Sequence, residues 1–322
     1  MENHPISQSI ELADNTNIVF ISDSSELTKK LAFYTNKAEK IFLHSLIINE
    51  VVDYLADNKF LLNKCYWIIW GYALYYDLEL KFYNRNDFNA HRHFKKIKQI
   101  LKNVKATISC FPADYELAKN KFSMKGKYYR ALNYDLLNID ENLNLKEKGQ
   151  NCINIIVGHA ADKNGRQLDV LQKLSFLNEE NVQIYCPLTY GSDLMKEAIV
   201  SAGQKIFNDK FTPLLKHLPD EEYDLFLDQM DIGIYDLTRQ RAGVNILKMI
   251  SKGKKVYISD SITTYSSLKS YGFTIYPINQ NQDYKNILNP FPKEIAVANH
   301  KIALKNFNKK AYLKKWEEIF YS

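Results

Sequence analysis

The stretch CYWIIWGYALY at residues 65–75 places two of the three tryptophans of the chain beside a glycine, where an apolar run ends. Such a run predicts a buried strand that leads into a loop. Aromatic packing in a core explains the stretch as well, because aromatic side chains bury large areas. Two other apolar runs also end at polar residues, one at His44 and one before Arg239 and Gln240. We therefore expect a cleft between two similar halves.

Length and composition agree with two halves. The chain has 322 residues, enough for two domains of roughly 150 residues each. The first 17 residues contain no apolar segment of the kind found in secretory signals, and the aromatic run at 66–76 is shorter than the roughly 18 residues of a membrane-spanning helix. No two cysteines form a C-x-x-C pair, which favours reduced thiols in a cytoplasmic protein; they are Cys65, Cys110, Cys152 and Cys186.

One region carries the basic excess of the chain. Residues 81–130 contain 13 lysines and arginines against 3 acids, a net charge of +10, whereas the whole chain has +6 and the remainder therefore −4. Within this region, residues 88–105 predict an amphipathic helix with an apolar stripe. Its polar surface suits anionic lipid headgroups better than nucleic acid, because no nucleic-acid motif accompanies it. A solvated helix face is the alternative. The basic residues are Arg92, Lys95, Lys96, Lys98, Lys102 and Lys105.

Short β-rich runs alternate with helical patterns along the chain, which predicts an α/β fold with parallel sheets covered on both faces. In the first half, strands are expected at 17–21, 40–44, 65–69, 106–110 and 128–132. In the second half they are expected at 152–157, 182–186, 205–207, 232–235, 255–259 and 274–277, and helices at 293–308 and 309–321 end the chain. We expect two Rossmann-like domains, residues 1–135 and 151–322, joined by a polar linker at 136–150.

Ligands of such sheets bind at the carboxyl ends of the strands, near the point where strand order reverses. Two strand exits in the second half offer glycines, which permit close approach of a backbone to a ligand. The first exit is GHAADKNGR at 158–166, where the start of the following helix is able to receive a diphosphate. The second is PLTYG at 187–191, with an aromatic face suited to a base or a sugar. Ordinary turns explain both exits equally well.

The sharpest motif is RQRAGVN at residues 239–245. It places two guanidiniums, an amide and a helix start on one spot, and arginine pairs bidentately with phosphate. A solvated arginine loop is the alternative. The predicted diphosphate site therefore centres on Arg239 and Arg241.

Several motifs taken together resemble the bacterial 4-acetamido-4,6-dideoxy-D-galactose (Fuc4NAc) transferases of glycosyltransferase family 56, which act in enterobacterial common antigen synthesis. The resemblance covers about residues 40–260. Its motifs, in chain order, are FLH at 42–44, WIIWG at 67–71 with Leu74 and Tyr75, VG at 157–158 with Asp162, Pro187 with Tyr190, DIG at 231–233, and Arg239 with Gln240.

The resemblance implies a GT-B transferase, with two Rossmann-like domains facing a central cleft and C-terminal helices. Such an enzyme lies on the cytoplasmic face of the membrane. It moves a deoxy or deoxyamino sugar from a nucleoside diphosphate, TDP in this family, to a saccharide linked to polyprenyl diphosphate in surface polysaccharide synthesis. No cofactor or divalent metal is implied.

Matching positions distribute the site over both halves. The acceptor side takes Trp70, Gly71 and Tyr75. On the donor side, the matching positions are Gly158, Asp162, Tyr190, Arg239 and Gln240. Further donor-side candidates from the same loops are His159, Asn164, Gly191, Arg241 and Asn245. For a direct displacement we expect His44 as the base, since its ordinary pKa near 6.5 suits neutral pH, with Asp77 in reserve.

Three positions depart from the family pattern: Ala73 stands where an aspartate is common, His159 begins an altered loop, and Arg241 replaces a glutamine. These departures point to a changed substrate pair or a reduced activity. Two other classes therefore stay open. One is a nucleotide-sugar epimerase of the same architecture, although no carboxylate pair supports it. The other is a non-catalytic scaffold that binds a nucleotide sugar.

Overall fold

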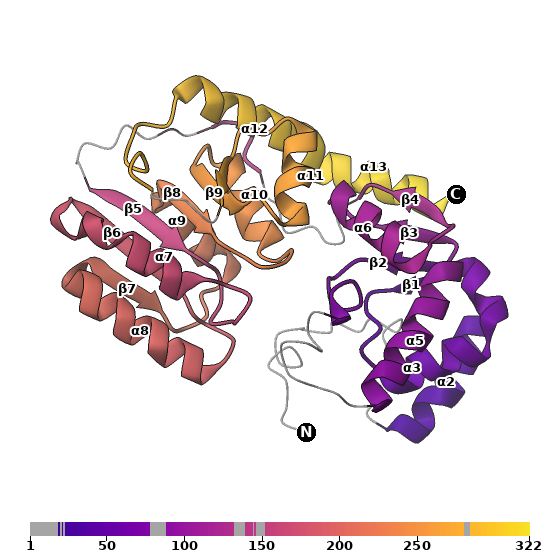
Figure 1. Cartoon of the computed structure of the whole chain (residues 1–322). Coiled ribbons are helices and arrows are strands. Elements are labelled where there is room, and N and C mark those ends of the chain that lie inside the picture. Colours follow the sequence, from indigo (N-terminus) through magenta and orange to yellow (C-terminus); the bar gives the residue numbers. More distant parts are fainter. Residues whose placement is uncertain are drawn as a thin grey trace.

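The computed structural model describes residues 19, 21, 23–77, 88–131, 139–143, 145, 152–279 and 284–322. The chain forms two parallel β-sheets, one in each half, with helices packed around both (Figure 1). The predicted α/β class is therefore confirmed. Most of the strand expected at 17–21 and most of the linker expected at 136–150 lie outside the described residues.

The first sheet has the strand order β1-β2-β3-β4, and its described neighbours all pair in parallel. The strands are β1 (Ile41–Leu43), β2 (Cys65–Ile68), β3 (Ala106–Ile108) and β4 (Lys127–Tyr129). The helical elements around it are α2 (Ser24–Lys37), α3 (Asn49–Asp57), the 3-10 turn η1 (Lys59–Lys64), α5 (Phe88–Asn103) and α6 (Pro112–Phe122). Four of the five strands expected in this half are thus found.

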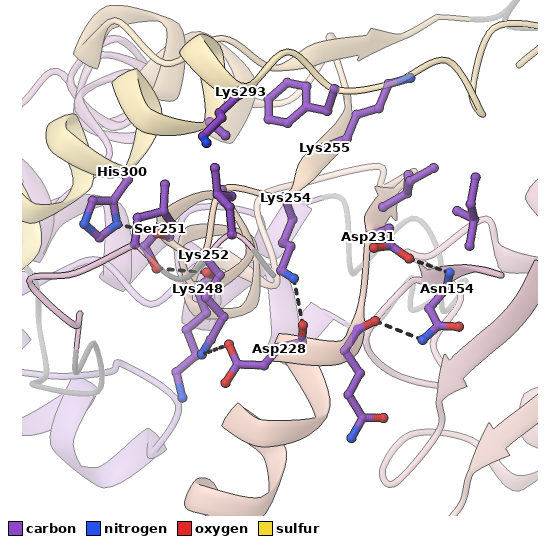
Figure 2. A pocket seen from close by; sticks show the side chains of 18 of the residues that line it. Asn154, Asp228, Asp231, Lys248, Ser251, Lys252, Lys254, Lys255, Lys293 and His300 are labelled. Atoms are coloured by element: carbon purple, nitrogen blue, oxygen red, sulfur yellow. Dashed lines mark hydrogen bonds and ion pairs between the residues drawn. The ribbon is translucent and has the colours of Figure 1, made fainter. Parts of the chain in front are cut away.

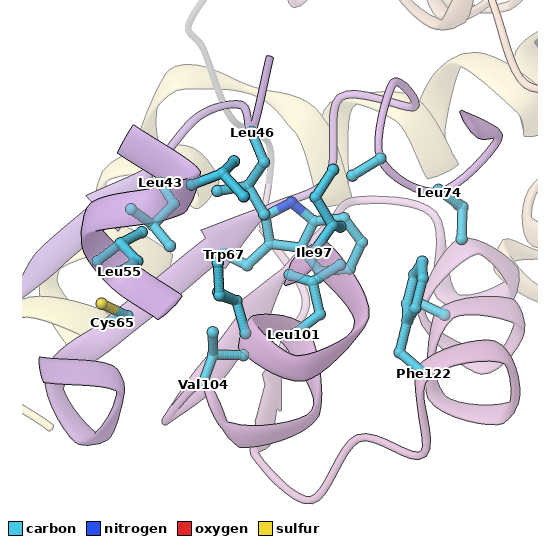
Figure 3. Close-up of a cluster of buried hydrophobic side chains, with 14 of the residues drawn as sticks. Leu43, Leu46, Leu55, Cys65, Trp67, Leu74, Ile97, Leu101, Val104 and Phe122 are labelled. Atoms are coloured by element: carbon cyan, nitrogen blue, oxygen red, sulfur yellow. The ribbon is translucent and has the colours of Figure 1, made fainter. Parts of the chain in front are cut away.

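Trp67 is the centre of the core between this sheet and its helices (Figure 3). The indole is 1% exposed and lies edge-on to the ring of Phe122, at 5.9 Å between ring centroids. The apolar stripe expected on α5 packs into the same core, where Ile97 and Leu101 are fully buried. Burial of an aliphatic side chain contributes about 1.5–3 kcal/mol, so this stripe fixes the helix on the sheet. Its basic residues consequently face away from the core.

The second sheet has the order β10-β9-β8-β5-β6-β7, again with parallel neighbours. Its strands are β5 (Ile153–Val157), β6 (Val182–Pro187), β7 (Phe211–Leu214), β8 (Ile232–Tyr235), β9 (Lys255–Ser259) and β10 (Tyr276–Ile278). Its helical elements are α7 (Gln167–Lys173), η2 (Ser175–Glu179), α8 (Asp193–Phe207), η3 (Asn208–Lys210), α9 (Asp220–Gln229), α10 (Gly243–Ser251) and α11 (Thr263–Tyr271). Strand order runs outward in both directions from β5 and β8, as in the doubly wound dinucleotide-binding fold.

The prediction of a strand at 205–207 is wrong. These residues form the last turn of α8, and the strand follows four residues later as β7. The apolar residues Ile199, Gly203 and Phe207 recur every four positions and are buried, which is helical spacing. A short apolar cluster at the end of a helix resembles a short strand, because too few residues are present to show a period.

The two C-terminal helices pack on different halves of the chain. Helix α12 (Lys293–Phe307) packs on α10, whereas α13 (Lys309–Phe320) crosses to the first half, where Figure 1 shows it beside α6 and β4. Ile319 is fully buried against the back of the first sheet, and the rings of Trp316 and Phe320 lie 5.6 and 5.4 Å from that of Phe42. The expected division at residue 151 did not anticipate this return of the chain.

Candidate functional site

The loops that follow β5, β6 and β8 meet at the carboxyl edge of the second sheet. Strands β5 and β8 are neighbours there, and they are the pair at which strand order reverses. Crevices at this position of doubly wound sheets bind ligands. The motifs at 158–166 and 239–245 leave the sheet from these two strands. The topology thus brings together the two segments predicted to hold a diphosphate.

Asp162 organises the loop after β5. Its Oδ1 accepts hydrogen bonds from the backbone N–H of Asn164 at 2.6 Å and from the Asn164 amide at 2.9 Å, while its Oδ2 forms an ion pair with Arg241 Nη1. Asn164 is 4% exposed, and its Oδ1 accepts from Thr238 Oγ1 at 3.0 Å. Burial alone would raise the pKa of Asp162, but the Asn164 N–H and Arg241 together hold it below its ordinary value. The carboxylate is therefore charged and ties the two loops together.

Glycines let the loops pack this closely. Gly191 has φ +119°, and a Cβ there would lie 2.1 Å from the carbonyl oxygen of Ala161. Backbone hydrogen bonds of 3.0 Å from Ala161 N–H to Tyr190 O, and of 2.8 Å from Ser192 N–H to Ala161 O, hold the loop after β5 against the loop after β6. Any side chain at position 191 would separate these two loops.

A second close contact lies behind the first loop. Gly158 has φ +73°, and the buried side chain of Gln167 occupies the space in which side chains at positions 158 and 165 would lie. Gln167 Nε2 also donates to the Ala160 carbonyl. Sequence reasoning did not select Gln167, because a glutamine at the first position of a helix carries no distinctive signal.

His159 is buried between cations. It is 5% exposed, and its Nδ1 has no hydrogen-bond partner within the described part of the chain. Burial and, next, the charge of Arg241 lower the pKa of His159 to about 3. Its ring lies edge-on to Tyr190 at 6.1 Å between centroids. The imidazole is therefore neutral at physiological pH, a polar but uncharged group inside the site.

The first half contributes to the same place. A Cβ at Gly71, which has φ +90°, would lie 3.4 Å from Arg239 Nη1 and 3.6 Å from Gln240 Oε1. The guanidinium carbon of Arg239 lies 5.7 Å from the centroid of the Tyr75 ring, within the range of a cation–π contact. The glycine after the second tryptophan and the arginine–glutamine pair thus face each other across the two halves. Asn245 is the third residue of α10 and is half-buried.

The two expected base residues are both engaged. Trp70 Nε1 donates to His44 Nδ1 at 3.3 Å, so the neutral ring carries its proton on Nε2 and presents a donor on that side. Burial lowers the pKa of His44. Asp77 forms an ion pair with Lys121, whose Nζ also donates to the Leu74 carbonyl at 2.5 Å. His44 would have to release Trp70 before its Nδ1 accepts a proton, whereas Asp77 keeps Lys121 beside one of its two carboxylate oxygens.

The basic face of α5 is mostly exposed, which leaves it available to a surface. Arg92, Lys95, Lys98 and Lys102 are exposed, whereas Lys96 forms an ion pair with Asp53 at 2.5 Å. Lys96 therefore differs from the other members of the set proposed for lipid headgroups. In the described segments, no helix is long and apolar enough to cross a bilayer.

A cavity of about 1040 Å³ lies at the opposite, amino edge of the second sheet (Figure 2). Three of its lysines have internal partners: Lys248 pairs with Asp224 at 2.7 Å, Lys252 pairs with Asp228 at 2.7 Å, and Lys255 donates to three carbonyl groups. Strand starts, rather than strand ends, line this cavity. The loops that carry the glycines and arginines lie at the other, carboxyl edge of this sheet.

Among the described residues, no three or more His, Cys, Asp or Glu side chains lie close enough together to form a metal site. The four cysteines are free thiols, three of them buried.

Comparison with known proteins supports a specific family. The family model described as 4-alpha-L-fucosyltransferase, glycosyl transferase group 56, matches residues 7–322. No significant match was found among curated protein sequences.

Solved structures share the fold at low sequence identity. Sucrose-phosphate synthase from Thermosynechococcus elongatus is similar with a TM-score of 0.64 and 12% identity, over 95% of this chain and 80% of that one. A glycosyltransferase from Rickettsia africae has a TM-score of 0.64 and 14% identity, over 97% and 83% of the two chains. Anabaena HepE in complex with UDP-glucose has a TM-score of 0.63 and 10% identity, over 92% and 82%. These likenesses establish a GT-B type fold.

Proposed function

This chain belongs to the 4-alpha-L-fucosyltransferase family, glycosyl transferase group 56, and we propose that it transfers a deoxy or deoxyamino sugar such as Fuc4NAc. The chain is a glycosyltransferase of GT-B fold. In our proposal the donor is a nucleoside diphosphate sugar, with TDP as the nucleotide, and the acceptor is a saccharide linked to polyprenyl diphosphate. The epimerase and scaffold alternatives lose support, because the family and the similar structures are glycosyltransferases.

One observation carries the proposal for the donor. Arg239 and Arg241 lie just before α10, on the loop that leaves β8 where strand order reverses. Ala242, with φ +56°, directly precedes that helix, so the first N–H groups of α10 lie next to both arginines in the chain. Guanidinium groups and a helix start each stabilise a diphosphate, and Arg241 would share its guanidinium between the diphosphate and Asp162.

The chemistry follows from where charge develops. An acceptor hydroxyl attacks the anomeric carbon, the bond from that carbon to the diphosphate oxygen breaks, and the hydroxyl proton passes to a base. Negative charge then grows on the leaving diphosphate, where prearranged cations lower the barrier. We assign this role to Arg239, with help from Arg241, and we propose that no divalent metal is needed. His44 and Asp77 remain our candidates for the base.

Residues of the first half would face the acceptor. Trp70 is 46% exposed and lies with His44 after adjacent strands, at the same edge as Gly71. The exposed cations of α5 would hold this half against anionic headgroups, where each one contributes about 1 kcal/mol. We therefore propose a peripheral position on the cytoplasmic face of the membrane, with the acceptor reaching the cleft from the lipid.

A thermal-shift screen with TDP, UDP, GDP and CMP tests the donor. A ligand that binds only the native state raises the melting temperature by mass action. We expect TDP to give the largest shift, and Arg239→Ala to abolish most of it. Arg92→Ala removes the same charge from an exposed helix face and serves as the matched control. A larger shift with another nucleotide would replace TDP as the donor, and no shift with any nucleotide would contradict the proposal.

A further inference from the structure

A buried carboxyl group joins the two halves next to the proposed donor site. Asp114, in the first turn of α6, is 1% exposed. Its Oδ1 accepts from Thr263 Oγ1 at 2.5 Å and from the Tyr75 hydroxyl at 3.3 Å. The hydroxyl groups of Tyr75 and Thr263 lie 2.9 Å apart. Three elements therefore meet at one point: the loop after β2, the start of α6 and the start of α11.

Further contacts hold α6 against the second half. The backbone N–H of Ala113 donates to Ser267 Oγ of α11 at 3.0 Å, and the Tyr271 hydroxyl donates to the Cys110 carbonyl at 2.8 Å. Phe111 fills the space beside Gly243, where a Cβ would lie 2.8 Å from its ring. Helix α6 of the first half is thus docked on α10 and α11 of the second.

A carboxyl group in such a place is costly, because its contacts are two hydroxyl groups and burial disfavours its charged form. Burial raises the pKa of Asp114 to about 7. An apolar residue would serve simple docking better. We therefore look for the role of this carboxyl group in its contact with the Tyr75 hydroxyl.

Tyr75 connects this network to the arginine loop. Its backbone N–H donates to the Gly71 carbonyl at 2.9 Å, and its ring lies 5.7 Å from the guanidinium carbon of Arg239. The hydroxyl end of the ring is fixed by Asp114 and Thr263, and the backbone end is fixed by Gly71. The Tyr75 ring is therefore held at both ends. The Arg239 guanidinium of the second half packs beside this fixed ring of the first half.

We propose that Asp114 and Thr263 are positioning residues for sugar transfer: they hold the Tyr75 hydroxyl so that the Tyr75 ring sets Arg239 for the donor diphosphate. The first half then completes the donor site of the second half. This rests on the proposed function, because it assumes that Arg239 binds the diphosphate. Donor affinity then depends on the docking of α6 against α11.

Thr263→Val tests the role of the hydroxyl at nearly constant volume, and Thr263→Ser restores it. We expect Thr263→Val and Tyr75→Phe each to weaken TDP binding by about 5-fold, the scale of one cation–π contact, and to raise the donor KM more than they lower kcat. Thr263→Ser keeps most of the affinity. If Thr263→Val merely loosens the fold, its melting temperature falls while TDP affinity stays that of the wild type, which overturns the proposal.

A double-mutant cycle separates this proposal from the one it rests on. Arg239→Ala alone tests the diphosphate site, and unchanged TDP affinity in that variant would contradict the site itself. When Arg239→Ala does weaken binding, the added Thr263→Val should have little further effect, because both changes act through the same guanidinium. Full additivity of the two losses would refute positioning while leaving the diphosphate site intact. Tyr75→Phe combined with Arg239→Ala provides the second cycle, with the ring retained.

Discussion

Replacing Asp114 by asparagine should change how the stability of the protein depends on pH. The carboxyl group has an ordinary pKa of 3.8 and a pKa of about 7 in the folded protein, where burial disfavours its charged form. The folded state therefore holds this proton more tightly than the unfolded state. The resulting stabilisation is fully present below about pH 4, and it is lost as the pH rises through about 7. Asparagine keeps the shape of the group but does not ionise.

The size of the effect follows from the pKa difference. A difference of about 3 units corresponds to about 4 kcal/mol at 1.36 kcal/mol per unit. With an unfolding entropy of about 2.1 cal/mol/K per residue, a chain of 322 residues shifts its melting temperature by about 6 °C for this energy. We therefore expect the melting temperature of Asp114→Asn, relative to the wild type, to rise by about 6 °C between pH 4 and pH 8.

Scanning calorimetry at one-unit pH steps measures this difference. Asp169→Asn, a change at an exposed carboxylate on α7, controls for the loss of one acid. Parallel curves of melting temperature against pH for the wild type and Asp114→Asn would refute the reasoning, because they would mean that Asp114 titrates alike in the folded and unfolded states.

Four other predictions follow from the same geometry. Gly191→Ala should destabilise the protein by about 3 kcal/mol in chemical denaturation and impair TDP binding, because the new Cβ would meet a backbone carbonyl. Gly272→Ala is the control: Gly272 has φ +94°, but a Cβ there would have its nearest atom at 3.6 Å, so this change should cost only about 1 kcal/mol. His159→Gln should change the level of kcat/KM but not the shape of its pH profile between pH 5 and 8, because the pKa of His159 is about 3; a lost inflection in that range would contradict its neutrality. Exchanging Lys95 and Lys98 for glutamate should weaken sedimentation with anionic vesicles and leave turnover of a detergent-dissolved acceptor intact, and unchanged sedimentation would remove α5 as the membrane surface. Excess EDTA should leave sugar transfer unaffected, and a loss restored by Mg²⁺ would overturn our metal-free assignment.

Much of the fold could be predicted from the sequence, because parallel strands are buried on both faces and therefore appear as continuous apolar runs. Strands β8 and β9 were predicted to the residue, and β5 to within one residue. The strand expected at 205–207 failed because its apolar cluster closes a helix. The return of α13 to the first sheet depends on which surface is left uncovered by the rest of the fold, and no local pattern records that.

The site was predictable to a similar degree. The approach of the loops at 158–166 and 239–245 follows from a general rule about strand ends, so the motifs alone were sufficient to bring them together. Asp114 and Thr263 were missed because each is ordinary within its own helix and they meet only across 149 positions of sequence. The engagement of His44 by Trp70 likewise depends on side-chain orientation, which residue spacing does not determine.

The most direct test of the central claim is calorimetric titration of TDP into the wild type and Arg239→Ala, with Arg92→Ala as the control. We expect Arg239→Ala to lose about 10- to 100-fold in affinity, the scale of a hydrogen bond to a charged group, and Arg92→Ala to bind as the wild type does. Equal affinity in all three proteins would contradict the assignment of the donor diphosphate to the edge where β5 and β8 meet.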